Sequence, residues 1–255
     1  MLYAVIRVYP VVADMNGGTL IQVTGEGFTS MSSLQCIFAG EYYGPATYFN
    51  STTVRCVAPA VSGTSESCGG ESLEVALYPG LTTKNSIGLR RISTPAILSL
   101  EPAKGFYTEG QWVTVRGYGF LSATTLACRF LAVGRAPVTV RLPHVRAISG
   151  TEMQCYQPPV PRPFPVPSYL EVAIDGQIYS QSLIRYDIVG LPTSLELDPL
   201  TLRLSAAARP LLPPLRVYTI DEFQHRVLQY DVGTYVGNVT VYPEGQPGQL
   251  VRIDS

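Results

Sequence analysis

Short stretches of alternating apolar and polar residues, separated by turn residues about every eight to twelve positions, run through the first three quarters of this chain. Within residues 19–23, we expect Ile21 and Val23 to face a core and Gln22 to face away. Similar patterns predict strands at residues 34–38, 53–57, 73–78 and 87–92. No stretch carries apolar residues at helical spacing, so the pattern predicts an all-β chain built from antiparallel sandwiches.

The first segment of the chain recurs as a second, similar copy later in the sequence. Adding 92 to its position numbers gives the same residue type at ten places: Pro10, Gly18, Val23, Gly25, Gly27, Phe28, Ser30, Leu34, Cys36 and Phe38. The offset then changes to 99, where Cys56 matches Cys155, and to 97 at residues 73–76, which indicates loops of different length on one scaffold. We therefore expect two sandwiches, residues 1–93 and 94–190, in which the repeated residues serve the fold.

The remaining residues, 191–255, contain no copy of the Gly-x-Gly-Phe segment. Alternating residues predict strands at 194–197, 202–204, 215–220, 227–230 and 238–242, so we expect a partial, β-rich, immunoglobulin-like module. Within the second sandwich, Asp175-Gly176 lies between two apolar runs at 170–174 and 178–183. This dipeptide favours a tight turn, and the pattern predicts a β-hairpin there.

Composition narrows the functional class. Charged residues make up 15% of the chain, the net charge is −1 and the isoelectric point is near 6.1, which gives no electrostatic footprint for nucleic acid. No apolar run approaches the roughly 20 residues of a membrane span, so we expect no membrane insertion within this chain. Residues 1–8 resemble a signal peptide only superficially, and their pattern predicts a first strand. We expect the chain to be part of a larger protein.

The five cysteines give evidence on the cellular compartment in which the protein folds. Cys36 with Cys56, and Cys128 with Cys155, recur at matching places in the two copies, which predicts one disulfide per sandwich between neighbouring strands. Buried free thiols in a cytosolic protein are the alternative. Cys68 has no counterpart, and it is free, linked to another chain, or paired with a cysteine outside this chain.

Two Asn-x-Thr sequons, at Asn50 and Asn238, predict N-glycosylation. Together with the paired cysteines, they favour an extracellular or cell-surface location.

Gly25-Glu26-Gly27-Phe28 and its copy at 117–120 are each followed by Cys-x-Phe and later by Cys-x-x-Pro. In this frame, the region from about residue 4 to 187 resembles the IPT/TIG domain, an immunoglobulin-like β-sandwich. The resemblance implies a domain that binds, spaces or dimerises and that has no catalytic role. Family members of this kind occur in plexin- and fibrocystin-like receptors, in secreted glycan-processing enzymes and in Rel-type transcription factors.

Candidate catalytic chemistry is sparse. Gly-x-Gly-Phe lacks the third glycine and the following helix of a dinucleotide site, so it predicts a tight bend with Phe in the core. His144 and His225 are the only histidines and have no zinc-ligand spacing around them. We therefore expect no catalytic residue, no cofactor and no metal, and the chain is not expected to be an enzyme.

The unmatched stretches are the candidates for recognition. The proline-rich residues 158–167 form either a stiff docking segment or a rigid edge that blocks aggregation. Residues 209–216 look like an SH3 ligand or a linker, and the tyrosines of residues 41–48 are interface residues or half-buried strand residues.

The function predicted from the sequence is non-catalytic: adhesion, recognition of an unknown protein or glycan ligand, or spacing in a surface or secreted protein. The alternatives are an accessory region of a secreted enzyme, and the dimerisation domain of an IPT-type DNA-binding protein.

Overall fold

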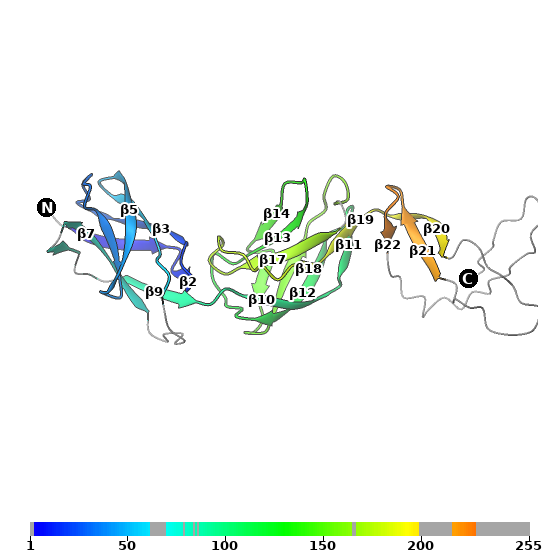
Figure 1. Ribbon diagram of the computed structural model, residues 1–255, viewed down its shortest axis with the longest axis horizontal. Coiled ribbons are helices and arrows are strands. Elements are labelled where there is room, and N and C mark those ends of the chain that lie inside the picture. Colours follow the sequence, from blue (N-terminus) through cyan, green and yellow to red (C-terminus); the bar gives the residue numbers. More distant parts are fainter. Residues whose placement is uncertain are drawn as a thin grey trace, which may run out of the picture. The chain divides into compact units, whose positions relative to one another are not determined.

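The computed structural model describes residues 3–61, 70–78, 80–83, 85, 87–164, 167–198 and 216–227. The chain divides into two compact units, residues 1–188 and 189–255, and each is described by itself. Every regular element among the described residues is a strand (Figure 1). The prediction of an all-β fold is confirmed.

The first unit begins with a sandwich whose strands run in the order β1-β3-β6-β5-β4-β7-β9-β2, with β8 beside β7. One layer holds β1, β3, β6 and the second half of β5, and the other holds the first half of β5 with β4, β7 and β9. The strands are β1 (Ala4–Tyr9), β2 (Val12–Asp14), β3 (Leu20–Glu26), β4 (Gln35–Phe38), β5 (Tyr42–Asn50), β6 (Thr53–Val57), β7 (Glu71–Tyr78), β8 (Leu81–Thr82) and β9 (Ile87–Ile92).

Strand β5 belongs to both layers. Its residues up to Pro45 pair with β4, and its residues from Ala46 on pair with β6. Gly44 lies at the crossing point, where a Cβ atom would stand 2.3 Å from the carbonyl oxygen of Val57. Only glycine leaves room for this close approach of two backbones.

The second sandwich has one sheet in the order β10-β12-β16-β15, another in the order β14-β13-β17-β18, and the pair β11-β19. The single strand β5 of the first copy is matched by two strands here, β14 on β13 and β15 on β16, with Leu142-Pro143-His144 between them. The strands are β10 (Ala96–Glu101), β11 (Lys104–Phe106), β12 (Gln111–Tyr118), β13 (Ala127–Ala132), β14 (Val138–Arg141), β15 (Val145–Ala147), β16 (Glu152–Gln157), β17 (Ser168–Ala173), β18 (Ile184–Arg185) and β19 (Asp187–Val189).

The predicted core positions are confirmed. Ile21 and Val23 on β3 are fully buried, as are their counterparts Val113 and Val115 on β12, while Gln22 is exposed. Each sandwich therefore buries the face that the alternation predicted, and hydrophobic burial supplies the main driving force for its folding.

The Gly-x-Gly-Phe segments are a structural device, as predicted. A Cβ atom on Gly117 would stand 1.9 Å from the carbonyl oxygen of Ala96 and 2.9 Å from Cζ of Phe120. Gly119 has φ of +76°, a conformation that favours glycine. The first copy repeats both features, and the two phenylalanines are buried at 1% and 5% exposure.

The prediction of a hairpin at Asp175-Gly176 is wrong for its second strand. Residues 178–183 form no strand, and β17 pairs instead with the short β18. The hydroxyl of Ser180 accepts the N–H of Val172, and the N–H of Ser180 donates to the carbonyl of Val172. This local bonding, together with φ of +50° at Leu183, takes the place of a regular ladder.

The second unit contains a three-stranded antiparallel sheet, β20 (Pro192–Asp198), β21 (Arg216–Asp221) and β22 (Arg226–Val227). Three of the predicted strands therefore have counterparts here. The predicted strands at 202–204 and 238–242 lie outside the described residues. Gly190 N–H donates to Oδ2 of Asp221 at 2.8 Å, so the start of this unit is bonded to its sheet.

Candidate functional site

Each sandwich core contains one disulfide. Cys36 on β4 is joined to Cys56 on β6, with Cα atoms 5.9 Å apart, and Cys128 on β13 is joined to Cys155 on β16, with Cα atoms 6.1 Å apart. All four residues are fully buried. The expectation that each bond joins neighbouring strands is wrong, because β4 and β6 do not pair and the bond crosses between the two layers.

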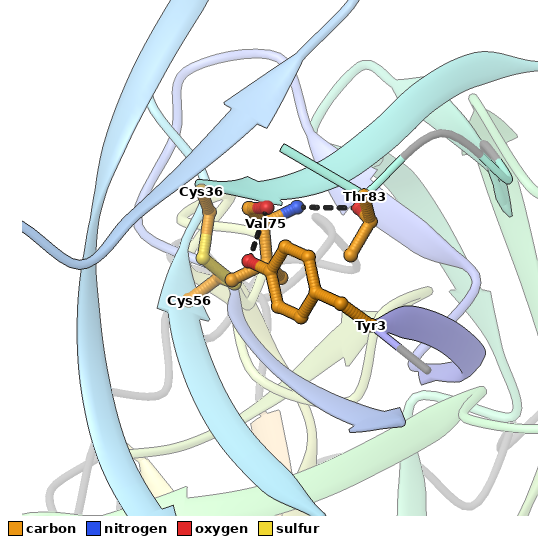
Figure 2. Close-up of a disulfide and its surroundings, with 5 residues drawn as sticks. All are labelled: Tyr3, Cys36, Cys56, Val75 and Thr83. Carbon is orange, nitrogen blue, oxygen red and sulfur yellow. Dashed lines mark hydrogen bonds between the residues drawn. A yellow bond between two sulfur atoms is a disulfide. The ribbon is translucent and has the colours of Figure 1, made fainter. Parts of the chain in front are cut away.

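Figure 2 shows the surroundings of the first disulfide. The hydroxyl of Tyr3 donates to the carbonyl of Val75 at 2.6 Å, and the N–H of Val75 donates to Oγ1 of Thr83 at 3.0 Å. Burial raises the pKa of Tyr3 to about 12. The tyrosine is therefore a neutral donor at physiological pH, and it ties the start of β1 to β7.

Asn50 ends β5 and is exposed, with Ser51 and Thr52 in the turn to β6. Its Oδ1 accepts hydrogen bonds from the N–H and the Oγ1 hydroxyl of Thr52, each at 2.9 Å. The sequon is therefore accessible and forms a compact local turn. Asn238 and Cys68 lie outside the described residues.

The two histidines have different neighbours. The ring of His144 lies 5.3 Å from that of Tyr156, and Nδ1 of His225 lies 3.2 Å from Oδ2 of Asp221. Burial raises the pKa of Asp221, but hydrogen bonds from the N–H groups of His225, Gly190 and Phe223 outweigh it, and the pKa ends below its usual value. In the described part of the chain, no group of three or more His, Cys, Asp or Glu side chains is placed to hold a metal ion.

The described part of the proline-rich stretch, residues 158–164, is anchored to the second sandwich. Val160 N–H donates to the carbonyl of Tyr107, Phe164 N–H donates to the carbonyl of Ile188, and Phe164 is buried at 1% exposure. The guanidinium of Arg135 lies 5.0 Å from the ring of Phe164. These contacts favour the interpretation of residues 158–164 as a rigid structural edge rather than as a free docking segment.

The tyrosines of β5 divide between core and solvent. Tyr42 and Tyr48 pack against the first core, whereas Tyr43 is 61% exposed. Only Tyr43 is presented as a contact residue.

An aromatic surface that the sequence analysis missed lies on the outward face of the sheet β10-β12-β16-β15. Trp112 and Tyr156 face each other across β12 and β16, with ring centroids 5.4 Å apart, and the guanidinium of Arg146 lies 4.6 Å from the Trp112 ring. Trp112 is 39% exposed. The signal was available, because Trp112 precedes the inward-facing Val113 and alternation places it outside.

No helix long and apolar enough to cross a membrane occurs among the residues that the structure describes.

Comparison with known proteins places the first sandwich in a family. Residues 4–80 match the model of the IPT/TIG domain. These residues form an IPT/TIG domain. The second sandwich repeats the IPT/TIG residue frame, its inter-layer disulfide and its Gly-x-Gly-Phe geometry.

Among curated proteins, the chain is 30% identical to Fibrocystin-L of Mus musculus over 123 residues, which is 46% of this chain and 3% of that protein. The chain therefore spans a small fraction of this relative. Among solved structures, it is similar to the Plexin A4 full extracellular region, with 14% identity, 89% of this chain and 20% of that chain covered, and a TM-score of 0.49. The family match covers residues 4–80, less than half of the chain, and the duplicated frame extends the resemblance into the second sandwich.

Proposed function

We propose that this chain is a non-catalytic, extracellular region of a surface or secreted protein, in which two IPT/TIG sandwiches present binding surfaces at a fixed spacing. The observation that supports this most is the buried disulfide at the same place in both cores. Structural disulfides persist in oxidising compartments, so the cross-links favour the cell exterior. We propose domain boundaries at residues 1–93, 94–190 and 191–255.

Binding is assigned to exposed residues that the two copies do not share. Trp112 and Tyr43 are of this kind, since the corresponding residue for Trp112 in the first copy is Leu20. Exposed aromatic residues are favoured in protein and glycan recognition because they provide a large contact area with little loss of conformational entropy. The partner is proposed to be a protein or glycan ligand.

The test is secretion of the full chain behind a signal peptide in cultured animal cells, followed by site-specific peptide mass spectrometry. We expect secreted protein that carries a glycan on Asn50, removable by a peptide N-glycosidase. Thr52→Ala abolishes this glycan, whereas Ser51→Ala, at the middle position of the sequon, keeps it. Protein that is retained and folds only in the reducing cytosol contradicts the proposal.

A further inference from the structure

A cleft of about 390 Å³ lies within the first unit, between the outward face of β3 and the turn that follows β17. The first sandwich contributes Tyr9, Gln22 and Arg55, and the strand register pairs Tyr9 with Gln22 and Gln22 with Arg55. Side chains at paired positions point to the same face, so these three form one row across β1, β3 and β6. The volume lies within the range of about 300–1,000 Å³ typical of small-molecule sites.

The opposite wall of the cleft is held in place by the turn after β17. The carboxylate of Asp175, at 3% exposure, accepts the N–H groups of Gln177 and Ile178 and the hydroxyl of Thr19 of the first sandwich, the last at 2.6 Å. The side-chain amide of Gln177 accepts the N–H of Leu20 at 3.0 Å and donates to its carbonyl at 2.8 Å. Both walls are therefore joined by hydrogen bonds before any ligand arrives.

Apolar packing fixes the same junction. Val12 and Ile92 belong to the first sandwich, yet they lie in the cluster of buried residues that forms the core of the second. Asp14 and Thr94 add a hydrogen bond of 2.6 Å between Oδ2 and the hydroxyl. A ligand that binds here consequently loses little of its binding energy to ordering the protein.

The cleft carries positive charge that no carboxylate neutralises at close range. Arg55 and Arg141 line it and are exposed, and within the described part of the chain no carboxylate lies within 4.0 Å of either guanidinium. The guanidinium of Arg55 lies 5.3 Å from the ring of Phe49, and Nη2 of Arg141 lies 3.4 Å from the carbonyl oxygen of Gly176. The carboxylate of Asp175 is engaged by Thr19 and by backbone N–H groups.

We propose that this cleft binds the carboxylate or sulfate group of an acidic saccharide. A planar guanidinium can bind such oxyanions through two parallel hydrogen bonds, and the amide of Gln22 suits sugar hydroxyls. Tyr9 and Leu20, at 47% and 42% exposure, offer apolar surface to the face of a sugar ring. The proposal rests on the proposed function, because acidic saccharides of this kind are met outside cells.

An acidic peptide is a weaker candidate. Extended peptides bind sheets mainly through backbone hydrogen bonds. At Leu20 both backbone groups are already bonded to Gln177, so the groups offered to a ligand are side chains.

The test is calorimetric titration of the secreted full chain with four probes: a heparin-derived tetrasaccharide, a hyaluronan tetrasaccharide with carboxylates only, neutral chitotetraose and a hexaglutamate peptide. We expect binding of one or both acidic tetrasaccharides and none of chitotetraose. Arg55→Gln and Arg141→Gln should each weaken binding about tenfold or more, the size of one charge-assisted hydrogen bond. Arg90→Gln, an equal charge change at an exposed position outside the cleft, should change affinity less than about twofold.

Three results overturn the cleft proposal: no binding of either acidic tetrasaccharide, an equal loss in Arg90→Gln, or tighter binding of the peptide than of the saccharides. Unchanged circular dichroism of each variant shows that the fold is intact. If the chain is secreted and glycosylated but binds no saccharide, the cleft proposal is wrong and the proposed function is retained. If the chain is not secreted, the proposed function is wrong whatever the cleft binds.

Discussion

Glu71→Ala tests the buried ion pair of the first sandwich. The carboxylate of Glu71 accepts two hydrogen bonds from Arg91, at 2.9 and 3.1 Å, and the side chains are 7% and 3% exposed. Arg91 also donates to the carbonyls of Asp14 and Pro59 and lies over the ring of Phe38. These further contacts prevent the guanidinium from turning to water once its partner is removed.

The expected loss is about 3–5 kcal/mol of unfolding free energy, the usual cost of leaving one charge of a buried pair uncompensated. With an m-value of about 1.5 kcal/mol per M urea, the midpoint falls by about 2 M or more. The second sandwich provides a matched control in Glu171→Ala. Its partner Arg129 is 35% exposed and can be partly rehydrated, so a loss of about 1–2 kcal/mol is expected.

Urea unfolding followed by hydrogen-exchange mass spectrometry resolves the two sandwiches. Peptides from β3 report the first sandwich in Glu71→Ala, and peptides from β12 report the second in Glu171→Ala. A loss below about 1 kcal/mol for Glu71→Ala, or a larger loss for Glu171→Ala, refutes the reasoning that burial of the guanidinium sets the cost.

Two further predictions concern the scaffold. Gly117→Ala places a Cβ atom 1.9 Å from the carbonyl oxygen of Ala96 and should lower the unfolding free energy, measured in urea, by at least about 3 kcal/mol. Gly150→Ala, with open space around it, should lower it by less than about 0.5 kcal/mol, and equal losses would contradict the close-approach argument. Burial raises the pKa of Tyr3 to about 12, above its unfolded value near 10, so its contribution to stability is complete below about pH 10 and is lost as pH rises through about 12. Tyr3→Phe should flatten the fall of the urea midpoint across this range, and an unchanged slope would contradict the prediction.

The duplicated frame made the core predictable from the sequence. Each copy must bury the same face of the same strands, so Val23 and Val115 recur at inward positions for a physical reason. The phenylalanines of Gly-x-Gly-Phe could be placed in the core on the same grounds, since residues that recur in both copies are expected to serve the shared fold.

The change of partners within β5 was not predicted, because its middle contains Gly44-Pro45, which usually marks a turn. In the fold, this dipeptide lies where the strand changes partners between layers, a tertiary feature that local propensity does not contain. The same limit explains the wrong geometry expected for the disulfides, because the spacing of Cys36 and Cys56 does not tell adjacent strands from opposed ones.

The cleft between β3 and the turn after β17 also could not be predicted from the sequence. Asp175-Gly176 was correctly predicted to form a turn, but the hydroxyl that Asp175 binds belongs to Thr19, 156 positions earlier. Similarly, Arg55 and Arg141 come from different copies and no pattern along the chain links them. Only the packing of one sandwich on the other brings these residues together.

The most direct test of the account is disulfide mapping of the secreted chain by mass spectrometry after proteolysis without reductant. We expect two linked peptide pairs, Cys36 with Cys56 and Cys128 with Cys155, that separate on reduction. Free thiols at these four positions, or links between the two sandwiches, would contradict a scaffold cross-linked once within each core.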